Sequence, residues 1–353
     1  MEKMDTKDVL YALGRPFSPI YSYAMHLREM GYKKGWFKQY AMGVPVVSVG
    51  NLTMGGTGKT PTVQYIARFL VQQGYFPAII SRGYGGKSRS PVNVVSDGKS
   101  LLLDAVVAGD EPRFLAETLP GVPVLTGVVR KIPAEKAVTM GADVLVLDDG
   151  FQHMRIKREV NLALFNADVL AGNSRIFPGG DLREPVKALH RATSFLITGV
   201  TPDNEERAHQ FGALLEQRFA GKRVDYSRYT VRQVVLLKED GSFEKIATLE
   251  LQALNLIGVS GIARPKSFHN TLKEVKANLA HFLTFPDHVP YTDKVIGNIQ
   301  KQARKYQADG IITTEKDMVK LRDTHLALPI YVVQMDSQMD ASFDQHILQS
   351  LLE

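Results

Sequence analysis

Short apolar runs alternate with helix-like stretches through much of the chain. The apolar runs have the length and the β-branched composition of buried strands, and they lie at residues 44–50, 76–81, 91–96, 122–126, 143–148, 160–165 and 194–199. Repeated strand–helix units build a mostly parallel sheet with helices on both faces. The pattern therefore predicts a doubly wound α/β fold, in which ligands bind at the carboxyl ends of the strands.

The pattern changes after a helical stretch at 204–219. Residues 229–246 read as two strands around Asp240-Gly241, a dipeptide that favours a hairpin turn. Strand and helix patterns then resume, so that a second, smaller α/β domain is predicted. We expect four parts, which are an N-terminal amphipathic segment at 1–40, a core domain at 41–225, a β-hairpin linker at 226–250 and the smaller α/β domain at 251–353.

The first forty residues combine an apolar stripe with basic and aromatic flanks. The stripe recurs at helical spacing, and its members are Leu10, Leu13, Phe17, Ile20, Ala24, Leu27 and Met30. Lys33, Lys34 and Lys38 lie near Trp36 and Phe37. Such a helix either packs on the domain core, as most amphipathic helices do, or lies on an anionic membrane surface. The pattern alone leaves both open and favours the core.

The turn after the first strand is rich in glycine and ends in a lysine and a hydroxyl residue. It comprises Thr53, Met54, Gly55, Gly56, Thr57, Gly58, Lys59 and Thr60. A strand, such a turn and a helix form the phosphate-binding loop (P-loop) of nucleoside triphosphatases, in which lysine binds the β- and γ-phosphates and the hydroxyl binds Mg²⁺. The strict pattern has glycine where this chain has Thr53, so a merely flexible turn is the alternative.

A second candidate site follows the buried run at 143–148, which ends in two carboxylates. In P-loop proteins an acidic strand end orders Mg²⁺ opposite the hydroxyl of the loop. Asp148 and Asp149 are therefore predicted to serve the metal, although a solvated Asp-Asp-Gly turn is the alternative and the pattern does not choose between the two carboxylates. His153 is a candidate ligand contact, but a lone histidine after a turn is more often structural.

Four further loops carry weaker signals. Arg82, which follows a strand and precedes a glycine-rich turn, is suited to a substrate phosphate or sugar. Asp110 is explained fully as the start of a helix, and alternatively is a base near an acceptor hydroxyl. Arg183 either stabilises charge during phosphoryl transfer or forms a surface ion pair. Asp287-His288 is a carboxylate–imidazole pair in a loop, which alone is a weak signal.

The amino-acid composition limits the classes of binding partner but does not identify one. The 353 residues carry a formal net charge of +6 and no cysteine, which favours anionic partners and excludes disulfides and thiolate metal sites. The polar N-terminus does not resemble a signal peptide, and no apolar run approaches the roughly 18 residues of a spanning helix. We expect a soluble or peripheral protein. No nucleic-acid-binding motif is present, and the basic residues are spread along the chain.

Taken together and in order, these motifs resemble the tetraacyldisaccharide 4′-kinase family, the lipid A 4′-kinases. The resemblance covers nearly the whole chain, and Thr53 is usual at its position in that family. The matching segments are Gly50-Asn51, 55–61, 81–85, Gly109-Asp110-Glu111-Pro112, 148–153, Phe177-Pro178, 182–185, 261–265 with Phe268, 285–288 and 313–317.

The resemblance implies a peripheral kinase on the cytoplasmic face of the bacterial inner membrane. It would use ATP and Mg²⁺ to phosphorylate the 4′-hydroxyl of an acylated glucosamine disaccharide 1-phosphate, giving a precursor of the lipid IVA type in lipopolysaccharide biosynthesis. The N-terminal segment would dock on an anionic membrane surface, which shifts our expectation for it toward the membrane. We further expect a monomer with no nucleic-acid partner.

The family's functional residues map onto positions of this chain. Asp110 becomes the general base and His288 its partner in a dyad, with Lys59 and Arg183 also in catalysis. Residues 53–60 would hold the nucleotide. Substrate contacts are assigned to Arg82, Tyr84, Gln152 and His153, and metal contacts to Thr60, Asp148, Asp149 and Glu184.

One other class of P-loop protein remains an alternative, the regulatory or partitioning ATPases. Those with a similar glycine-rich loop typically carry a second lysine just before the paired glycines, where this chain has Met54. A nucleic-acid-binding protein is a third reading, and it rests on the positive charge alone.

Overall fold

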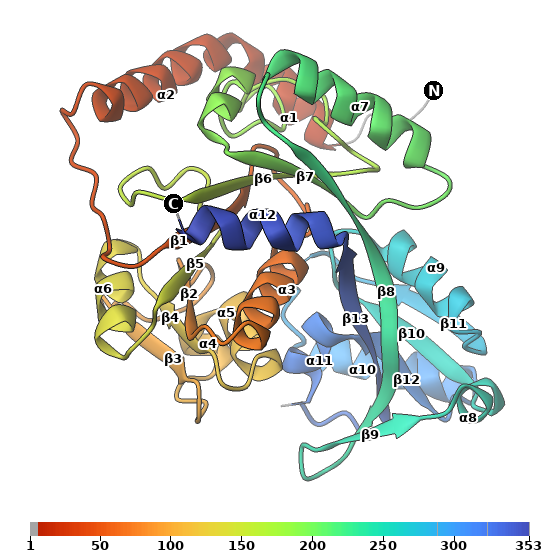
Figure 1. The fold of residues 1–353 in the computed structure, drawn as a ribbon. Coiled ribbons are helices and arrows are strands. Elements are labelled where there is room, and N and C mark those ends of the chain that lie inside the picture. The colour runs from red at the N-terminus through yellow and green to blue at the C-terminus, as the bar shows by residue number, and fades with distance from the viewer. Residues whose placement is uncertain (1–5, 288, 323, 353) are drawn as a thin grey trace.

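A computed structural model describes residues 6–287, 289–322 and 324–352. Its described strands form one mixed sheet in the order β11-β10-β12-β13-β8-β7-β6-β1-β5-β2-β4-β3, with β9 paired to β8. Helices cover the sheet, and Figure 1 shows two lobes joined by the long strand β8. The predicted fold class, a doubly wound α/β core with a smaller α/β part and a hairpin, is confirmed.

The first lobe contains the strands that the apolar runs predicted. They are β1 (Val46–Asn51), β2 (Pro77–Ser81), β3 (Asn93–Asp97), β4 (Pro123–Thr126), β5 (Val144–Asp148), β6 (Val160–Asn166) and β7 (Ser194–Thr198). All pair in parallel except β3, which pairs antiparallel with β4 at the sheet edge. Strands covered on both faces need continuous apolar sequence, as β1 and β5 have.

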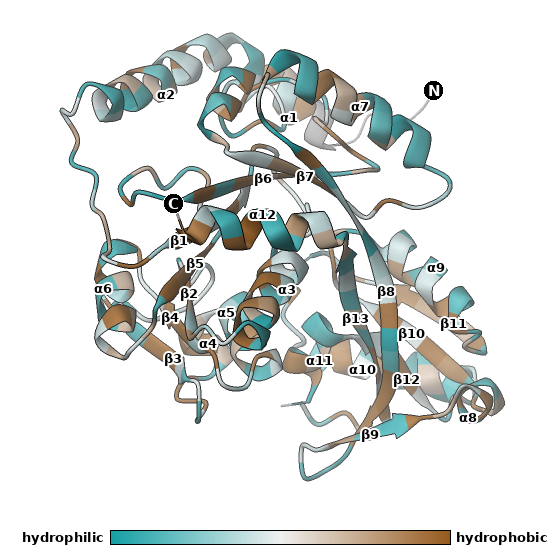
Figure 2. Ribbon diagram, in the orientation of Figure 1, coloured by the Kyte–Doolittle hydropathy of each residue, from teal (hydrophilic) through white to brown (hydrophobic). Residues whose placement is uncertain are grey.

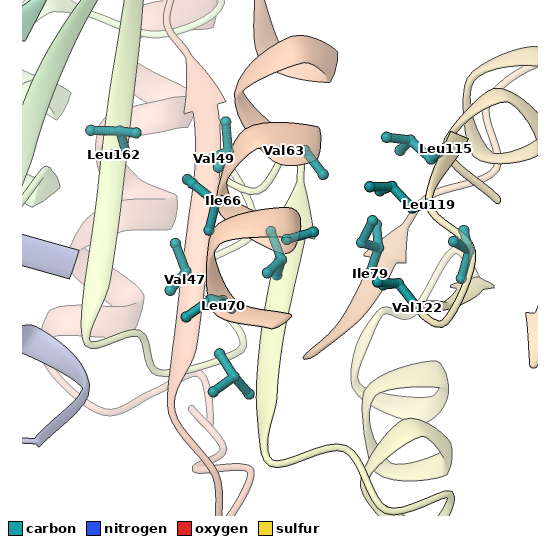
Figure 3. Close-up of a cluster of buried hydrophobic side chains, with 14 of the residues drawn as sticks. Val47, Val49, Val63, Ile66, Leu70, Ile79, Leu115, Leu119, Val122 and Leu162 are labelled. Carbon is teal, nitrogen blue, oxygen red and sulfur yellow. The ribbon is translucent and has the colours of Figure 1, made fainter. Parts of the chain in front are cut away.

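The helices of this lobe connect successive strands. They are α3 (Lys59–Gln72), α4 (Ala105–Ala108), α5 (Asp110–Thr118), α6 (Lys131–Thr139), the short 3₁₀ helix η2 (Val186–Arg191) and α7 (Glu205–Arg218). Apolar residues of α3 lie against those of β1 in the main core, and Leu115 of α5 joins the same cluster near Ile79 of β2 (Figure 3). Because α3 packs directly on the sheet, the turn that precedes it is held at the carboxyl end of β1.

The second lobe continues the same sheet. Its strands are β8 (Val224–Leu237), β9 (Phe243–Ile246), β10 (Leu256–Ser260), β11 (Leu279–Thr284), β12 (Gly310–Thr314) and β13 (Ile330–Met339). Its helices are α8 (Thr248–Ala253), α9 (Pro265–Glu274), α10 (Asp293–Lys305) and α11 (Glu315–Leu321). The start of β8 pairs with β7 and the rest pairs with β13, so one strand belongs to both lobes.

The final helix, α12 (Ala341–Leu352), returns to the first lobe. Phe343, Ile347 and Leu351 lie in the same buried cluster as β1 and α3. Figure 1 shows α12 beside these central elements rather than with the second lobe. The chain therefore crosses between the lobes twice, once along β8 and once from β13 into α12.

The N-terminal segment forms α1 (Thr6–Gly14), the 3₁₀ helix η1 (Arg15–Phe17) and α2 (Ser18–Lys33). Apolar residues gather in the strands of the sheet (Figure 2), yet Leu13, Phe17 and Ile20 of this segment are 60% or more exposed. In the described ranges no helix is long and apolar enough to cross a membrane. The N-terminal helices therefore pack on the protein through one side and leave large apolar side chains in solvent.

Candidate active site

The glycine-rich turn lies between β1 and α3, at the carboxyl edge of the sheet. Gly58 precedes α3 with φ of +78°, and a Cβ atom there would lie 2.0 Å from the hydroxyl of Tyr229. The hydroxyl of Thr198 donates a hydrogen bond to the carbonyl of Thr57 at 2.9 Å. Thr198 of β7 and Tyr229 of β8 therefore contact the turn. Only glycine fits at position 58.

Two cations converge on one carboxylate beside this turn. Lys59 Nζ lies 3.5 Å from Asp149 Oδ1 and 3.2 Å from Asn51 Oδ1. Arg183 Nη1 lies 2.8 Å from Asp149 Oδ2. The structure therefore brings Lys59, Asp149 and Arg183 together, although they come from three separate segments of the chain.

The two adjacent aspartates have opposite electrostatic environments. Burial acts to raise the pKa of Asp149, but Lys59, Arg183 and Arg130 outweigh it and lower that pKa to about 2. Burial raises the pKa of Asp148 to about 6, helped by the neighbouring carboxylates. Asp148 is almost fully buried and accepts a hydrogen bond from Ser81 Oγ at 3.1 Å. Asp149 is therefore the more exposed and more firmly ionised of the pair.

Arg130 belongs to the site, and the sequence analysis missed it. It lies just before α6, and its Nη1 donates to the carbonyl of Asp149 at 2.7 Å. Burial lowers its pKa, while Asp149 and Asp148 act to raise it. Its position shortly after β4, on the same sheet edge as the turn, was the available signal.

Asp110, which the family resemblance assigned as the general base, is the first residue of α5. Asp110 Oδ2 lies 2.8 Å from Lys320 Nζ, which comes from α11 in the second lobe. Its predicted partner His288 falls outside the described residues. The preceding residue, Asp287, lies 3.2 Å from Lys316 Nζ, also on α11.

The residues assigned to substrate lie around these groups in different environments. Tyr84 is 78% exposed, and Arg82 is exposed beside it. Gln152 Nε2 donates to the carbonyl of Asn51 at 2.8 Å, which ties it to the end of β1. Burial, followed by Arg130, lowers the pKa of His153 to about 3, so this imidazole is neutral.

Glu184 lies in a different ion-pair cluster. Its carboxylate pairs with Arg191 and lies 3.8 Å from Arg28 Nη1 of α2. Among the described residues, no three acidic or imidazole side chains are grouped as a metal site. The structure thus does not join Glu184 to Asp148 and Asp149 in a common cluster.

The remaining donors fit Mg²⁺ bound together with phosphate. Magnesium in such sites is held by one or two carboxylates, by phosphate oxygens and by water. The Thr60 hydroxyl at the start of α3 and the carboxylates of Asp148 and Asp149 are hard oxygen donors of this kind. Lys59, Arg183 and the backbone N–H groups at the start of α3 suit the phosphates.

Comparison with known proteins agrees with this chemistry. A family model described as "Tetraacyldisaccharide-1-P 4'-kinase" matches residues 10–352. A curated tetraacyldisaccharide 4′-kinase from Desulfotalea psychrophila is 44% identical over 354 residues, covering 98% of each chain. One of the same name from Syntrophus aciditrophicus is 39% identical over 344 residues, covering 95% of this chain and 91% of that one.

A solved structure has the same fold. The crystal structure of LpxK from Aquifex aeolicus in complex with ATP has a TM-score of 0.77 and 29% sequence identity to this chain. The match covers 95% of this chain and 98% of the other.

Proposed function

The chain belongs to the tetraacyldisaccharide 4′-kinase family, and from that premise we propose how its residues perform the reaction. The protein is an ATP-dependent kinase of lipid A biosynthesis. It phosphorylates the 4′-hydroxyl of an acylated glucosamine disaccharide 1-phosphate. The observation that carries the residue assignments is the convergence of Lys59, Arg183 and Arg130 on Asp149 beside the glycine-rich turn.

We infer that residues 53–60 form the P-loop that binds the ATP phosphates. Lys59 binds the β- and γ-phosphates, and Arg183 stabilises the charge that is spread over the γ-phosphoryl oxygens in the transition state. Thr60, Asp148 and Asp149 would hold Mg²⁺, which neutralises phosphate charge when it is bound. Because Asp149 now pairs with Lys59 and Arg183, bound phosphate would compete with it for both cations.

Asp110 is proposed to accept the proton of the 4′-hydroxyl, with His288 as its partner. Phosphoryl transfer through a loose transition state needs alignment and charge neutralisation more than a strong base. A carboxylate that takes the proton late in the reaction meets this need. Arg82, Tyr84, Gln152 and His153 are proposed to contact the sugar. The family resemblance assigned Glu184 to the metal, but we propose no metal contact for it, because its carboxylate pairs with Arg191 and lies 3.8 Å from Arg28 Nη1.

The N-terminal helices are proposed to dock on the anionic inner-membrane surface at its cytoplasmic face. Leu10, Leu13, Phe17 and Ile20 are exposed apolar side chains on this segment, and Lys33 and Lys34 follow near its end. Apolar insertion and basic attraction together stabilise such interfacial helices. We further propose that the protein acts as a monomer.

The first test is the transfer of radiolabelled γ-phosphate from ATP-Mg²⁺ to detergent-dispersed tetraacyl disaccharide 1-phosphate. Wild type should yield labelled lipid, and Lys59→Ala should lower the rate by about 10²-fold or more, since a charge contact to the transition state is lost. Lys99→Ala, at an exposed turn, serves as the matched control and should keep the wild-type rate.

ATP hydrolysis without labelled lipid would mean that the acceptor is different. In that case the partitioning-ATPase alternative would become the leading one.

A further inference from the structure

One face of α5 is directed at α11 of the second lobe. Asp110, Phe114 and Glu117 are spaced by four and three residues, so they lie along one side of the helix. Each of the three meets the second lobe. Asp110 pairs with Lys320, Phe114 lies in the second lobe's core cluster, and Glu117 pairs with Arg322.

The middle of this contact is apolar. Phe114 is buried in one cluster with Met318 and Leu321 of α11, although the rest of α5 packs in the first lobe's core. Burying a large aromatic side chain removes apolar surface from water and so stabilises such a contact. Phe114 and the Glu117–Arg322 pair therefore connect α5 to α11 independently of Lys320.

Lys320 connects Asp110 to a further segment of the second lobe. Its side chain is only 9% exposed, and its Nζ lies 2.8 Å from Asp110 Oδ2. The same Nζ donates to the carbonyl of Val289 at 3.4 Å. An ammonium group has three donors, so one lysine joins the carboxylate of Asp110 to the loop that contains Val289. The described residues of this loop are 285–287 and 289–291, and we call them the 285–291 loop.

Lys316, one helical turn earlier on α11, repeats this arrangement. Its Nζ lies 3.5 Å from Glu111 Oε1 and 3.2 Å from Asp287 Oδ1. Two lysines on one face of α11 therefore each link the first turn of α5 to the 285–291 loop. We call Lys316 and Lys320 the lysine clamp.

We propose that Lys320 is a positioning residue for the phosphoryl-transfer reaction, which fixes the Asp110 carboxylate relative to the 285–291 loop across the two lobes. The inference rests on the proposed role of Asp110 as the base. The Lys320 side chain is only 9% exposed and that of Asp110 is 30% exposed, so solvent screens the ion pair less than it screens a fully exposed one and the pair holds the carboxylate in one place. Lys316 supports the same loop from the neighbouring turn.

The test compares Lys320→Met with Lys320→Arg in the lipid kinase assay. Lys320→Met keeps most of the length of the side chain and removes its charge, and it should lower kcat by at least about tenfold, a part of what a general base contributes. The KM for ATP should stay within about twofold, because the clamp does not touch the residues at the P-loop. Lys320→Arg, which keeps the charge, should recover much of the rate.

A matched control is Lys301→Met, an exposed lysine on α10 of the same lobe, which should behave as wild type. A double variant separates positioning from loss of structure. If Lys320 acts through Asp110, adding Lys320→Met to Asp110→Asn should lower kcat no further. Wild-type kcat in Lys320→Met, or an equal loss in both backgrounds, would overturn the inference.

Failure of the underlying assignment gives a different result. If Asp110→Asn keeps the wild-type rate, Asp110 is not the base. The lysine clamp is then tested by a second measurement, amide hydrogen exchange. Lys320→Met should speed exchange in peptides that cover 105–118 and the 285–291 loop, since both lose a common partner. Unchanged exchange in both segments would refute the clamp itself.

Discussion

At the scale of single residues, neighbours in sequence have very different environments. Asp148 is buried and accepts from Ser81, whereas Asp149 has φ of +51° and faces Lys59 and Arg183. The left-handed backbone at Asp149 turns the chain so that the second carboxylate leaves the strand direction. A non-glycine residue in this conformation is uncommon, and it is often found at functional sites.

His153 allows a prediction of how stability depends on pH. Burial and Arg130 lower its pKa to about 3 from 6.5, so between these values the unfolded chain binds a proton that the folded protein does not. Stability should therefore fall as the pH falls. From pH 7 to pH 5 this group alone should remove about 2 kcal/mol from the free energy of unfolding.

The measurement is chemical denaturation at both pH values for wild type, His153→Gln and the exposed-site control His26→Gln. His153→Gln should lose stability less steeply than the other two proteins. Parallel losses in all three would contradict a neutral buried His153.

At the scale of elements, the N-terminal helices hold the loop that carries Arg183. Tyr21 Oη donates to the carbonyl of Arg183 at 2.9 Å, and Ser18 Oγ donates to the carbonyl of Ile176 at 2.9 Å. On its other side, this loop bonds to the P-loop segment, because the Met54 amide donates to the carbonyl of Asp181 at 2.7 Å. The loop that carries Arg183 therefore lies between the N-terminal helices and the P-loop, and it bonds to both.

This contact predicts that Tyr21→Phe lowers kcat. The substitution removes one hydrogen bond worth about 1 kcal/mol and leaves the ring in place, so a loss of about fivefold is expected if the bond orients Arg183. Tyr23→Phe, on the exposed side of the same helix, should leave kcat unchanged. Equal rates in the two variants would show that the loop keeps its position without the Tyr21 hydroxyl.

At the scale of the whole molecule, the two lobes are interlocked rather than linked in series. β8 pairs with β7 of one lobe and β13 of the other, and α12 then returns from β13 to the first core. Phe114 makes the reverse connection, from α5 into the second core. A substitution that destabilises one lobe should therefore also destabilise the other.

The return of α12 predicts a large effect of Phe343→Ala on stability. Phe343 is fully buried in the first lobe's core, so the truncation should lower the free energy of unfolding by about 3–5 kcal/mol. Leu352→Ala, on the exposed end of the same helix, should change it by less than about 0.5 kcal/mol. Denaturant titration of both variants provides the measurement. Similar values for the two would mean that α12 is not part of the core.

The sequence by itself determined the features that depend on local order. Apolar runs predicted β1 to β7 because a strand covered on both faces must be apolar throughout. The glycine-rich turn with Lys59, and the acidic end of β5, were visible because parallel strands place their carboxyl ends on one edge. The resemblance of ordered motifs then identified the family.

Only the tertiary structure decided which distant residues meet. No spacing along the chain predicts three of the pairs in the structure. They are Arg130 with Asp149, Lys320 with Asp110, and Glu184 with Arg191. The return of α12 was equally hidden, since an amphipathic helix shows that it has an apolar face and not which core receives it. Pairing and packing depend on complementary surfaces brought together by the whole fold, and this information is absent from any local pattern.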